Sequence, residues 1–277
     1  MKKAVLSFVR NSLVGIAALS VAAPAYAGPL SYTGGTYTQD FDTLPSTGSG
    51  SVANRGPNYI NPSWTGVTGS NLTGWQFANP TGTGTSTEYR AQDGSLSGSA
   101  GRGVVSFGTT GSSDRALGAL STSAQIPTFG LVLTNNTSQL LTSFTLSFTG
   151  EQWRRGDAVP QDSLLFTWGL GSDISGSYTA ASALNFTSPT AAPLNSALDG
   201  NLAINQTAKS ATITGINWGV GQTLVLKWTA QELSGQDDGL AIDNLSFSAV
   251  PEPSSLALAA MGLIGTVGYA VRRRRAS

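Results

Sequence analysis

The sequence contains no cysteine and no histidine among its 277 residues. The chain therefore cannot carry a Ser-His-Asp triad, a cysteine nucleophile, a histidine general base, a zinc site built on Cys or His, or an iron–sulfur cluster. Disulfide bonds are excluded as well, so an exported domain must depend on its hydrophobic core for stability. Charged residues are scarce, at 11% of the chain, which is about half the usual share. Hydrophobic residues, at 40%, are frequent enough to predict a folded protein rather than a disordered one.

The N-terminus has the three parts of a secretory signal peptide. A basic start precedes a short apolar stretch, residues 13–23, and small residues then occupy the positions that signal peptidase reads. The basic residues are Lys2, Lys3 and Arg10, and the small ones are Ala25 and Ala27. We therefore predict that residues 1–27 are a signal peptide, that signal peptidase cleaves between Ala27 and Gly28, and that the chain is exported by the general secretory route.

The C-terminus also has three parts in a fixed order. A Pro-Glu-Pro motif is followed by a run without charge and then by four arginines. The motif is Pro251, Glu252 and Pro253, and the arginines are Arg272, Arg273, Arg274 and Arg275. As a helix, the uncharged segment 254–271 would span roughly 27 Å, just enough to cross the hydrocarbon core of a bilayer. Because clustered arginines stay on the cytoplasmic side, we expect a transmembrane helix with the rest of the chain outside.

This order of parts over residues 250–277 resembles the PEP-CTERM sorting signal of Gram-negative bacteria. The resemblance implies transient anchoring in the inner membrane, cleavage near residues 251–253 by an exosortase-type protease, and release to the cell surface or the extracellular medium. Because such systems accompany polysaccharide export, it also implies a role in biofilm or exopolysaccharide. Without the resemblance, the same features predict a tail-anchored domain on the outer side of the membrane.

The body between the two signals is acidic, although the whole chain is neutral. Residues 28–250 contain eight basic and fourteen acidic side chains, which gives a net charge of −6. A body with this charge and no basic stripe is a poor binder of nucleic acid, so we expect no nucleic-acid partner. Calcium or a neutral polymer such as an exopolysaccharide suits it better.

The body has the sequence pattern of β-strands. Apolar Phe144, Leu146 and Phe148 alternate with threonine and serine, and residues 224–228 and 245–247 repeat the pattern. Glycine, serine, threonine, asparagine and proline separate these runs. We predict an all-β fold, a two-sheet antiparallel sandwich of the jelly-roll or lectin-like type, over residues 28–249.

Two kinds of segment refine this expectation. Residues 131–133 and 164–166 are apolar throughout, which predicts strands covered on both faces. Residues 43–74 contain many turn formers and few strand signals, so we expect long loops there.

Acidic residues near both ends of the body form a candidate metal site. Asp40 and Asp42 lie near its start, and Asp243 and Asn244 lie in its last predicted strand. In a regular strand Asp243 shares the apolar face with Leu245, so its carboxylate would point inward and need a partner. Calcium takes about six to eight oxygen ligands of mixed type, which makes these four polar residues candidate ligands. The alternative is an arginine or backbone-amide network without a metal; no other cofactor is expected.

The same segments are similar to lectin-like jelly-roll modules of secreted bacterial proteins. Those modules have an acidic motif with phenylalanine in the first strand, here residues 40–42, and an Ile-Asp-Asn motif in the last, here residues 242–244. Several of them bind structural calcium where the two strands meet. Residues 151–154, 198–201 and 239–243 also resemble a set found in exported bacterial sandwich modules, which implies an accessory or adhesive domain.

Trp153 and Glu151 form a second candidate site, beyond the strand that starts near Phe144. If the alternation continues, both side chains point away from the core. An exposed indole beside a carboxylate can bind sugar, because the ring stacks on the apolar face of the sugar and the acid accepts hydroxyl protons. The alternative is structural packing, since strands often end in a bulge and such residues can hold a loop.

From these features we predict an exported, non-catalytic surface or extracellular-matrix protein. The alternative function is a lectin-like carbohydrate-binding module with a glycan site near Trp153 and Glu151. A glycoside hydrolase is a weaker alternative. Such enzymes need only two carboxylates, but no spacing among the acidic residues singles out a pair.

Overall fold

The computed structural model describes residues 28–52, 72–78 and 87–251. The predicted signal peptide and the segment from residue 252 lie outside the described residues, as does part of the predicted loop region. Within the described ranges, no helix is long and apolar enough to cross a membrane. The last described strand ends at Val250, directly before Pro251.

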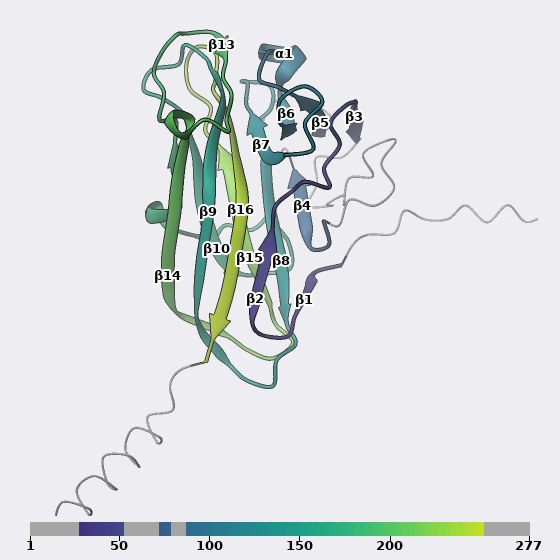
Figure 1. Cartoon of the computed structure of the whole chain (residues 1–277). Helices are drawn as coiled ribbons and strands as arrows, with labels where there is room; N and C mark the ends of the chain where they lie inside the picture. Colours follow the sequence, from purple (N-terminus) through teal and green to yellow (C-terminus); the bar gives the residue numbers. More distant parts are fainter. Residues whose placement is uncertain (1–27, 53–71, 79–86, 252–277) are drawn as a thin grey trace, which may run out of the picture.

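Two β-sheets pack face to face in a sandwich (Figure 1). Sheet A has seven strands, in the order β1 (Leu30–Tyr32), β8 (Thr128–Asn135), β15 (Thr223–Ala230), β10 (Ser163–Leu170) and β11 (Thr179–Ala180), with β4 (Trp75–Ala78) beside β8 and β12 (Phe186–Thr187) beside β10. Sheet B has nine strands, in the order β13 (Ser196–Ala197), β9 (Leu141–Arg155), β16 (Gly239–Val250), β7 (Ala116–Leu120), β6 (Gly103–Phe107), β5 (Thr87–Gln92) and β3 (Ser49–Val52), with β14 (Gln206–Trp218) beside β9 and β2 (Thr36–Gln39) beside β16. The short helices are α1 (Gly98–Gly101), η1 (Ser182–Leu184) and η2 (Ala203–Asn205).

The all-β sandwich prediction is confirmed, with one refinement of its topology. Most neighbouring strands are antiparallel, but β1 pairs in parallel with β8, and β5 pairs in parallel with β6. The loop prediction for residues 43–74 is wrong in part, because Ser49–Val52 form β3, which pairs with β5.

The main core lies between the sheets, where the alternating apolar residues of β9, β15 and β16 meet. Phe144, Leu146 and Phe148 are buried there, as predicted. The indoles of Trp75 on β4 and Trp228 on β15 stack with ring centroids 6.0 Å apart, although β8 lies between these two strands. Such rings bury much apolar area, which a domain without disulfides needs.

Outer faces are covered in some places and open in others. Val132 lies in a second small cluster on the outer side of sheet A, so the prediction that residues 131–133 are covered on both faces is confirmed. The same prediction for residues 164–166 is wrong, because Leu165 is 38% exposed. A third cluster lies on the outer side of sheet B and contains Phe107, Trp153 and Ala241.

A β-bulge at Asn244 changes the face on which residues of β16 lie. The register to β9 shifts between Asp243 and Ser246, and Asn244 adopts a left-handed conformation with φ 49°. Because the bulge adds one residue, Ile242 and Leu245 both enter the main core. The prediction that Asp243 shares a face with Leu245 is therefore wrong: Asp243 lies on the outer side of sheet B.

Candidate functional site

Trp153 and Glu151 lie on the outer side of sheet B, as the alternation predicted, but neither is exposed. Trp153 is 1% exposed and Glu151 is 2% exposed. The indole stacks on Phe107, with ring centroids 6.1 Å apart and planes 9° from parallel. Its Nε1–H donates to Glu151 Oε2 at 3.0 Å, and Gln206 Nε2 donates to Glu151 Oε1 at 3.0 Å. The expected open glycan site at these residues is therefore wrong, and the structural alternative describes them.

A second layer of chain covers Trp153. Gly200, in the connection between β13 and β14, packs so closely on the indole that a Cβ there would clash with the ring. Gly94 approaches the backbone of Trp153 equally closely. Both glycines are distant from residue 153 in the sequence, so the local pattern of β9 held no sign of this cover.

Glu151 and Asp243 are buried close to each other and to other acids. Burial, together with the charge of Asp243, raises the pKa of Glu151 to about 8. Burial likewise raises the pKa of Asp243 to about 7, with additional contributions from Asp114, Asp42 and Asp40. These five acidic residues are named here the acidic corner.

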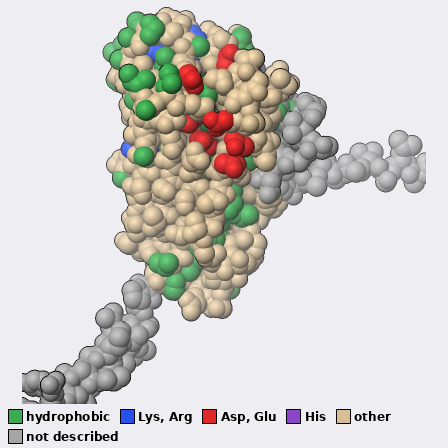
Figure 2. Space-filling model, viewed as in Figure 1, with side chains coloured by type: hydrophobic (Ala, Val, Ile, Leu, Met, Phe, Trp, Pro, Cys, Tyr) green, Lys and Arg blue, Asp and Glu red, His purple; other side chains and the backbone are tan. Residues whose placement is uncertain are grey.

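The acidic corner brings together three separate parts of the chain. Asp42 Oδ1 accepts a hydrogen bond from the backbone N–H of Arg115 at 3.0 Å, which joins the end of β2 to the start of β7. Asp114 Oδ2 accepts one from Asn201 Nδ2 at 2.7 Å. Figure 2 shows Asp and Glu side chains gathered on one area of this face, above a broad area without charged side chains.

The predicted calcium ligands fit a metal only in part. Asp243 Oδ1 is buried without a hydrogen-bond partner, while Asn244 Nδ2 donates to Asp243 Oδ2 at 2.7 Å. Asp40 and Asp42 are exposed and both influence Asp243 electrostatically. In the part of the chain that the structure describes, however, no group of three or more acidic side chains has a ready geometry for holding a metal ion. Calcium here would need backbone carbonyl or water oxygens to complete its shell.

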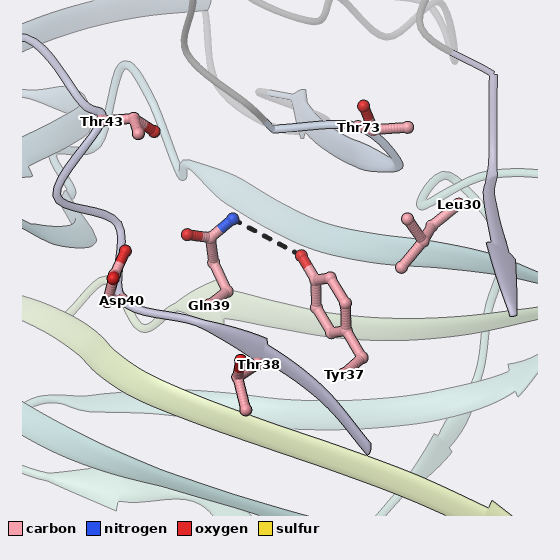
Figure 3. A pocket seen from close by; sticks show the side chains of 7 residues that line it. All are labelled: Leu30, Tyr37, Thr38, Gln39, Asp40, Thr43 and Thr73. Carbon is pink, nitrogen blue, oxygen red and sulfur yellow. Dashed lines mark hydrogen bonds between the residues drawn. The ribbon is translucent and has the colours of Figure 1, made fainter. Parts of the chain in front are cut away.

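A cavity of about 210 Å³ lies beside the acidic corner, between β2 and the segments that contain Leu30 and Thr73 (Figure 3). Tyr37 and Gln39 are two residues apart on β2, so their side chains point to the same side of the strand. The remaining lining residues are Thr38, Asp40 and Thr43. Hydroxyl, amide and carboxylate groups therefore surround one aromatic ring.

Tyr37 is held in place by its hydroxyl group. The hydroxyl oxygen accepts hydrogen bonds from Trp75 Nε1 at 3.1 Å and from Gln39 Nε2 at 3.5 Å. Gln39 Oε1 accepts the backbone N–H of Phe41 at 2.9 Å, at the turn that ends β2. Burial raises the pKa of Tyr37, so the phenol remains neutral at physiological pH.

A second cavity, of about 310 Å³, lies on the other side of β2. It is lined by Thr38, Gln39 and Asp40, together with Asn244, Leu245 and Ser246 of the β16 bulge. The two cavities share Thr38, Gln39 and Asp40, and together they are named here the β2 notch. Of the predicted metal residues, Asp40 and Asn244 thus line the notch, whereas Asp42 and Asp243 line neither of its two cavities.

Asp237 and Asp238 are close to Asp243 in the sequence but lie in a different cluster, with Asp162 and Arg155. Arg155 NH1 donates to Asp238 Oδ1 at 2.8 Å in a nearly fully buried ion pair. The backbone N–H of Asp238 donates to Asp162 Oδ2 at 2.6 Å. The predicted alternative of an Asp–Arg network therefore exists in the protein, but at Asp238.

Residues 249–275 match the PEP-CTERM protein-sorting motif. This match confirms the prediction of a sorting signal, and such a signal implies an exported protein that an exosortase processes. Of the motif, Pro251 is exposed after β16, while Glu252, Pro253 and the arginine cluster lie outside the described residues, as does Ala27 at the predicted signal cleavage site. No curated protein matches the chain.

Several solved structures resemble the body. One is the enzymatically active domain of tailspike protein 4 from bacteriophage CBA120, at 10% identity and a TM-score of 0.33, a match that covers 65% of this chain and only 20% of that one. Another is TmCBM61 in complex with beta-1,4-galactotriose, at 13% identity and a TM-score of 0.27, covering 51% of this chain and 74% of that one. A third is the K3 cleaved adhesin domain of Lys-gingipain from Porphyromonas gingivalis W83, at 16% identity and a TM-score of 0.38, covering 63% and 91%. Likenesses this distant carry no argument about function.

Proposed function

We propose that this exported protein is a non-catalytic surface or extracellular-matrix protein that binds a neutral glycan in the β2 notch. The observation that supports the proposal is the lining of the notch, where Tyr37 and several hydroxyl and amide groups surround a cavity with one carboxylate, that of Asp40. Sugars are recognised by such a combination, because their hydroxyls both donate and accept hydrogen bonds and their C–H faces contact aromatic rings.

The size and the charge of the site favour a neutral chain over a single charged ligand. The two cavities, of about 210 and 310 Å³, meet at Thr38, Gln39 and Asp40, so a linear ligand could cross the end of β2. The adjoining acidic corner would repel uronic acids or sulfated sugars. A neutral exopolysaccharide is therefore the ligand class that we propose, in agreement with the biofilm role that the sorting signal implies.

The lining also supports a non-catalytic role. Glycoside hydrolysis needs two carboxyl groups that face one bond, and Asp40 is the one carboxylate among the residues that line the notch. Glu151 is buried, and both of its oxygens accept hydrogen bonds. We propose on these grounds that the protein binds glycan without cleaving it.

Affinity electrophoresis in gels that contain neutral or anionic polysaccharides tests the proposal. Neutral polysaccharide should retard the body, and Asp40→Asn and Thr43→Lys should reduce the retardation. Asp173→Asn is the matched control, because the Oδ1 atoms of Asp173 and Asp40 each accept the backbone N–H two residues later. No retardation by any neutral polysaccharide, or retardation unchanged in both notch variants, would contradict the proposal.

We also propose that calcium binds at the acidic corner, with Asp243 and Asp42 as ligands and Asp40 and Asn244 close by. The specific support is Asp243 Oδ1, which is buried and lacks a hydrogen-bond partner. In addition, no described basic side chain forms an ion pair with the acidic corner. A bound cation would satisfy this oxygen and offset the mutual repulsion of the acids. Calcium would then hold the end of β2 against β16 and support the notch.

A further inference from the structure

The strands at the edges of the two sheets differ greatly in length. Six of the described edge strands, β1, β2, β3, β4, β11 and β12, have between two and four residues each. β14 has 13 residues and pairs with β9 on one side only. Proteins commonly shorten their edge strands, because a long free edge offers unpaired N–H and C=O groups to another chain. β14 lacks this protection.

On the free side of β14, the backbone groups have no partner among the described residues. Apart from the ladder to β9, the described residues form no hydrogen bond with the backbone of residues 206–217. Ala208, Ser210, Thr212 and Thr214 are exposed on the outer face of the strand. On the inner side, Leu184 of η1 is buried in the core that Ala211 and Ile213 adjoin. Water, or a further strand, must pair with the free backbone groups.

The side chains of β14 suit a second copy of the same strand. The strand contains no proline and no acid, and Lys209 is its one charged residue. The acidic side chains belong to other segments, and Glu151, which accepts a hydrogen bond from Gln206 at the start of β14, is buried, so two copies could approach through β14 with little repulsion. A strand related to itself by a two-fold axis pairs antiparallel, and small Ser, Thr and Ala side chains place no steric obstacle in such a pair.

We propose that two copies of this protein associate through β14, antiparallel and edge to edge, so that the two copies of sheet B become one continuous sheet. The pairing would also join two outer faces that carry hydroxyl groups. On each copy Thr145 pairs with Thr212 and Ser147 pairs with Ser210, and the Oγ1 atoms of Thr145 and Thr212 are 2.8 Å apart. This inference is independent of glycan binding and goes beyond it.

Sedimentation velocity of residues 28–251, which contain both sheets and the whole described core, tests the proposal. The wild-type body should shift from monomer to dimer as its concentration rises to about 1 mM. Ser210→Lys combined with Thr212→Lys should keep it monomeric, because paired edges would then bring four added positive charges together. Thr36→Lys combined with Leu96→Lys adds the same charge at exposed positions away from β14 and should leave the dimer intact.

Hydrogen exchange gives a second readout that does not depend on the variants. In the dimer, alternate backbone amides of residues 206–217 should exchange at least tenfold more slowly at high than at low protein concentration, while exposed loop amides should not change. A body that stays monomeric over the whole range would overturn the proposal. A dimer whose β14 amides gain no protection would also overturn it, because the contact would then lie elsewhere.

Discussion

The indole of Trp153 donates a hydrogen bond to Glu151 at 3.0 Å, and both side chains are buried on the outer side of sheet B. The pair joins β9 to the neighbouring strand β14, since Glu151 also accepts a hydrogen bond from Gln206. A residue pair that could have bound sugar at an open surface therefore stabilises the fold instead.

Replacement of Trp153 by phenylalanine should measure this structural role. The ring stack on Phe107 can persist, but Glu151 Oε2 loses its donor, so the free energy of unfolding should fall by about 1–3 kcal/mol more than loss of ring volume alone explains. Trp228→Phe is the matched control, because Trp228 is equally buried and its Nε1 has no hydrogen-bond partner. Urea unfolding checks both variants, and an equal loss in the two would refute the role of the hydrogen bond.

The alternation in β9 predicted the face of Trp153 correctly and its exposure incorrectly. Period-two patterns are local, so they report which side of a strand a residue occupies. Whether that side is open depends on distant residues, here Phe107 and Gly200, which the pattern of β9 does not contain. The main core and the all-β fold follow from local patterns, whereas the cover over Trp153 does not.

The bulge in β16 and the β2 notch show the same limit. Asn244 tolerates a left-handed conformation, but the sequence does not state that the strand must bulge there, and the bulge reversed the predicted face of Asp243. The notch combines Leu30, Tyr37 and Thr73 from three segments. Its position depends on how the edges of the two sheets meet, so no single motif could have located it.

Calcium should raise the thermal midpoint of the body. If calcium binds only the folded state, a calcium concentration one hundred times its Kd raises the free energy of unfolding by about 2.7 kcal/mol. For a domain of this size, that gain corresponds to a rise of roughly 5–10 °C in the thermal midpoint. Asp243→Asn should abolish the rise and should stabilise the protein in chelator, because it removes a buried carboxylate that has no partner at Oδ1.

Differential scanning calorimetry in excess chelator and in millimolar calcium makes this comparison. Asp173→Asn serves as the control, since it also removes a carboxylate but lies outside the acidic corner, and it should retain the calcium response. Identical midpoints of the wild-type body in the two solutions would exclude a calcium site in the folded state.

Processing at the sorting motif should remove the arginine cluster. We expect the surface-released protein to end near Pro251, with Arg272–Arg275 absent, and Glu252→Ala to retain the full tail in the membrane fraction. Ser277→Ala, beyond the matched residues 249–275, should be processed normally. Intact-mass analysis of the released protein checks the prediction, and a released form that still contains the arginines would contradict it.

Asp162 and Asp237 form a buried acid pair whose proton links stability to pH. Burial, together with nearby negative charges, raises the pKa of Asp162 to about 7 and that of Asp237 to about 6. Asp162 Oδ1 has no partner among the described donors, so we expect a proton shared between Asp162 and Asp237 to satisfy it. In the unfolded chain both carboxyls titrate near the ordinary value of 3.8. Between about pH 4 and pH 7 the folded state therefore holds protons that the unfolded state has lost.

The sign of the pH effect follows from this difference. A raised folded-state pKa contributes stability that is fully present below about pH 4 and is lost as the pH rises through about 7, so the free energy of unfolding should fall over this range.

Asp162→Asn imitates the protonated pair: its side-chain oxygen can still accept the N–H of Asp238, and its amide can donate to Asp237. The variant should match the wild type near pH 5 and exceed its stability near pH 8. Asp173→Asn should show no such pH-dependent gain. Urea midpoints at the two pH values decide the matter, and an Asp162→Asn variant that is less stable than the wild type near pH 8 would show that the pair is ionised and satisfied in another way.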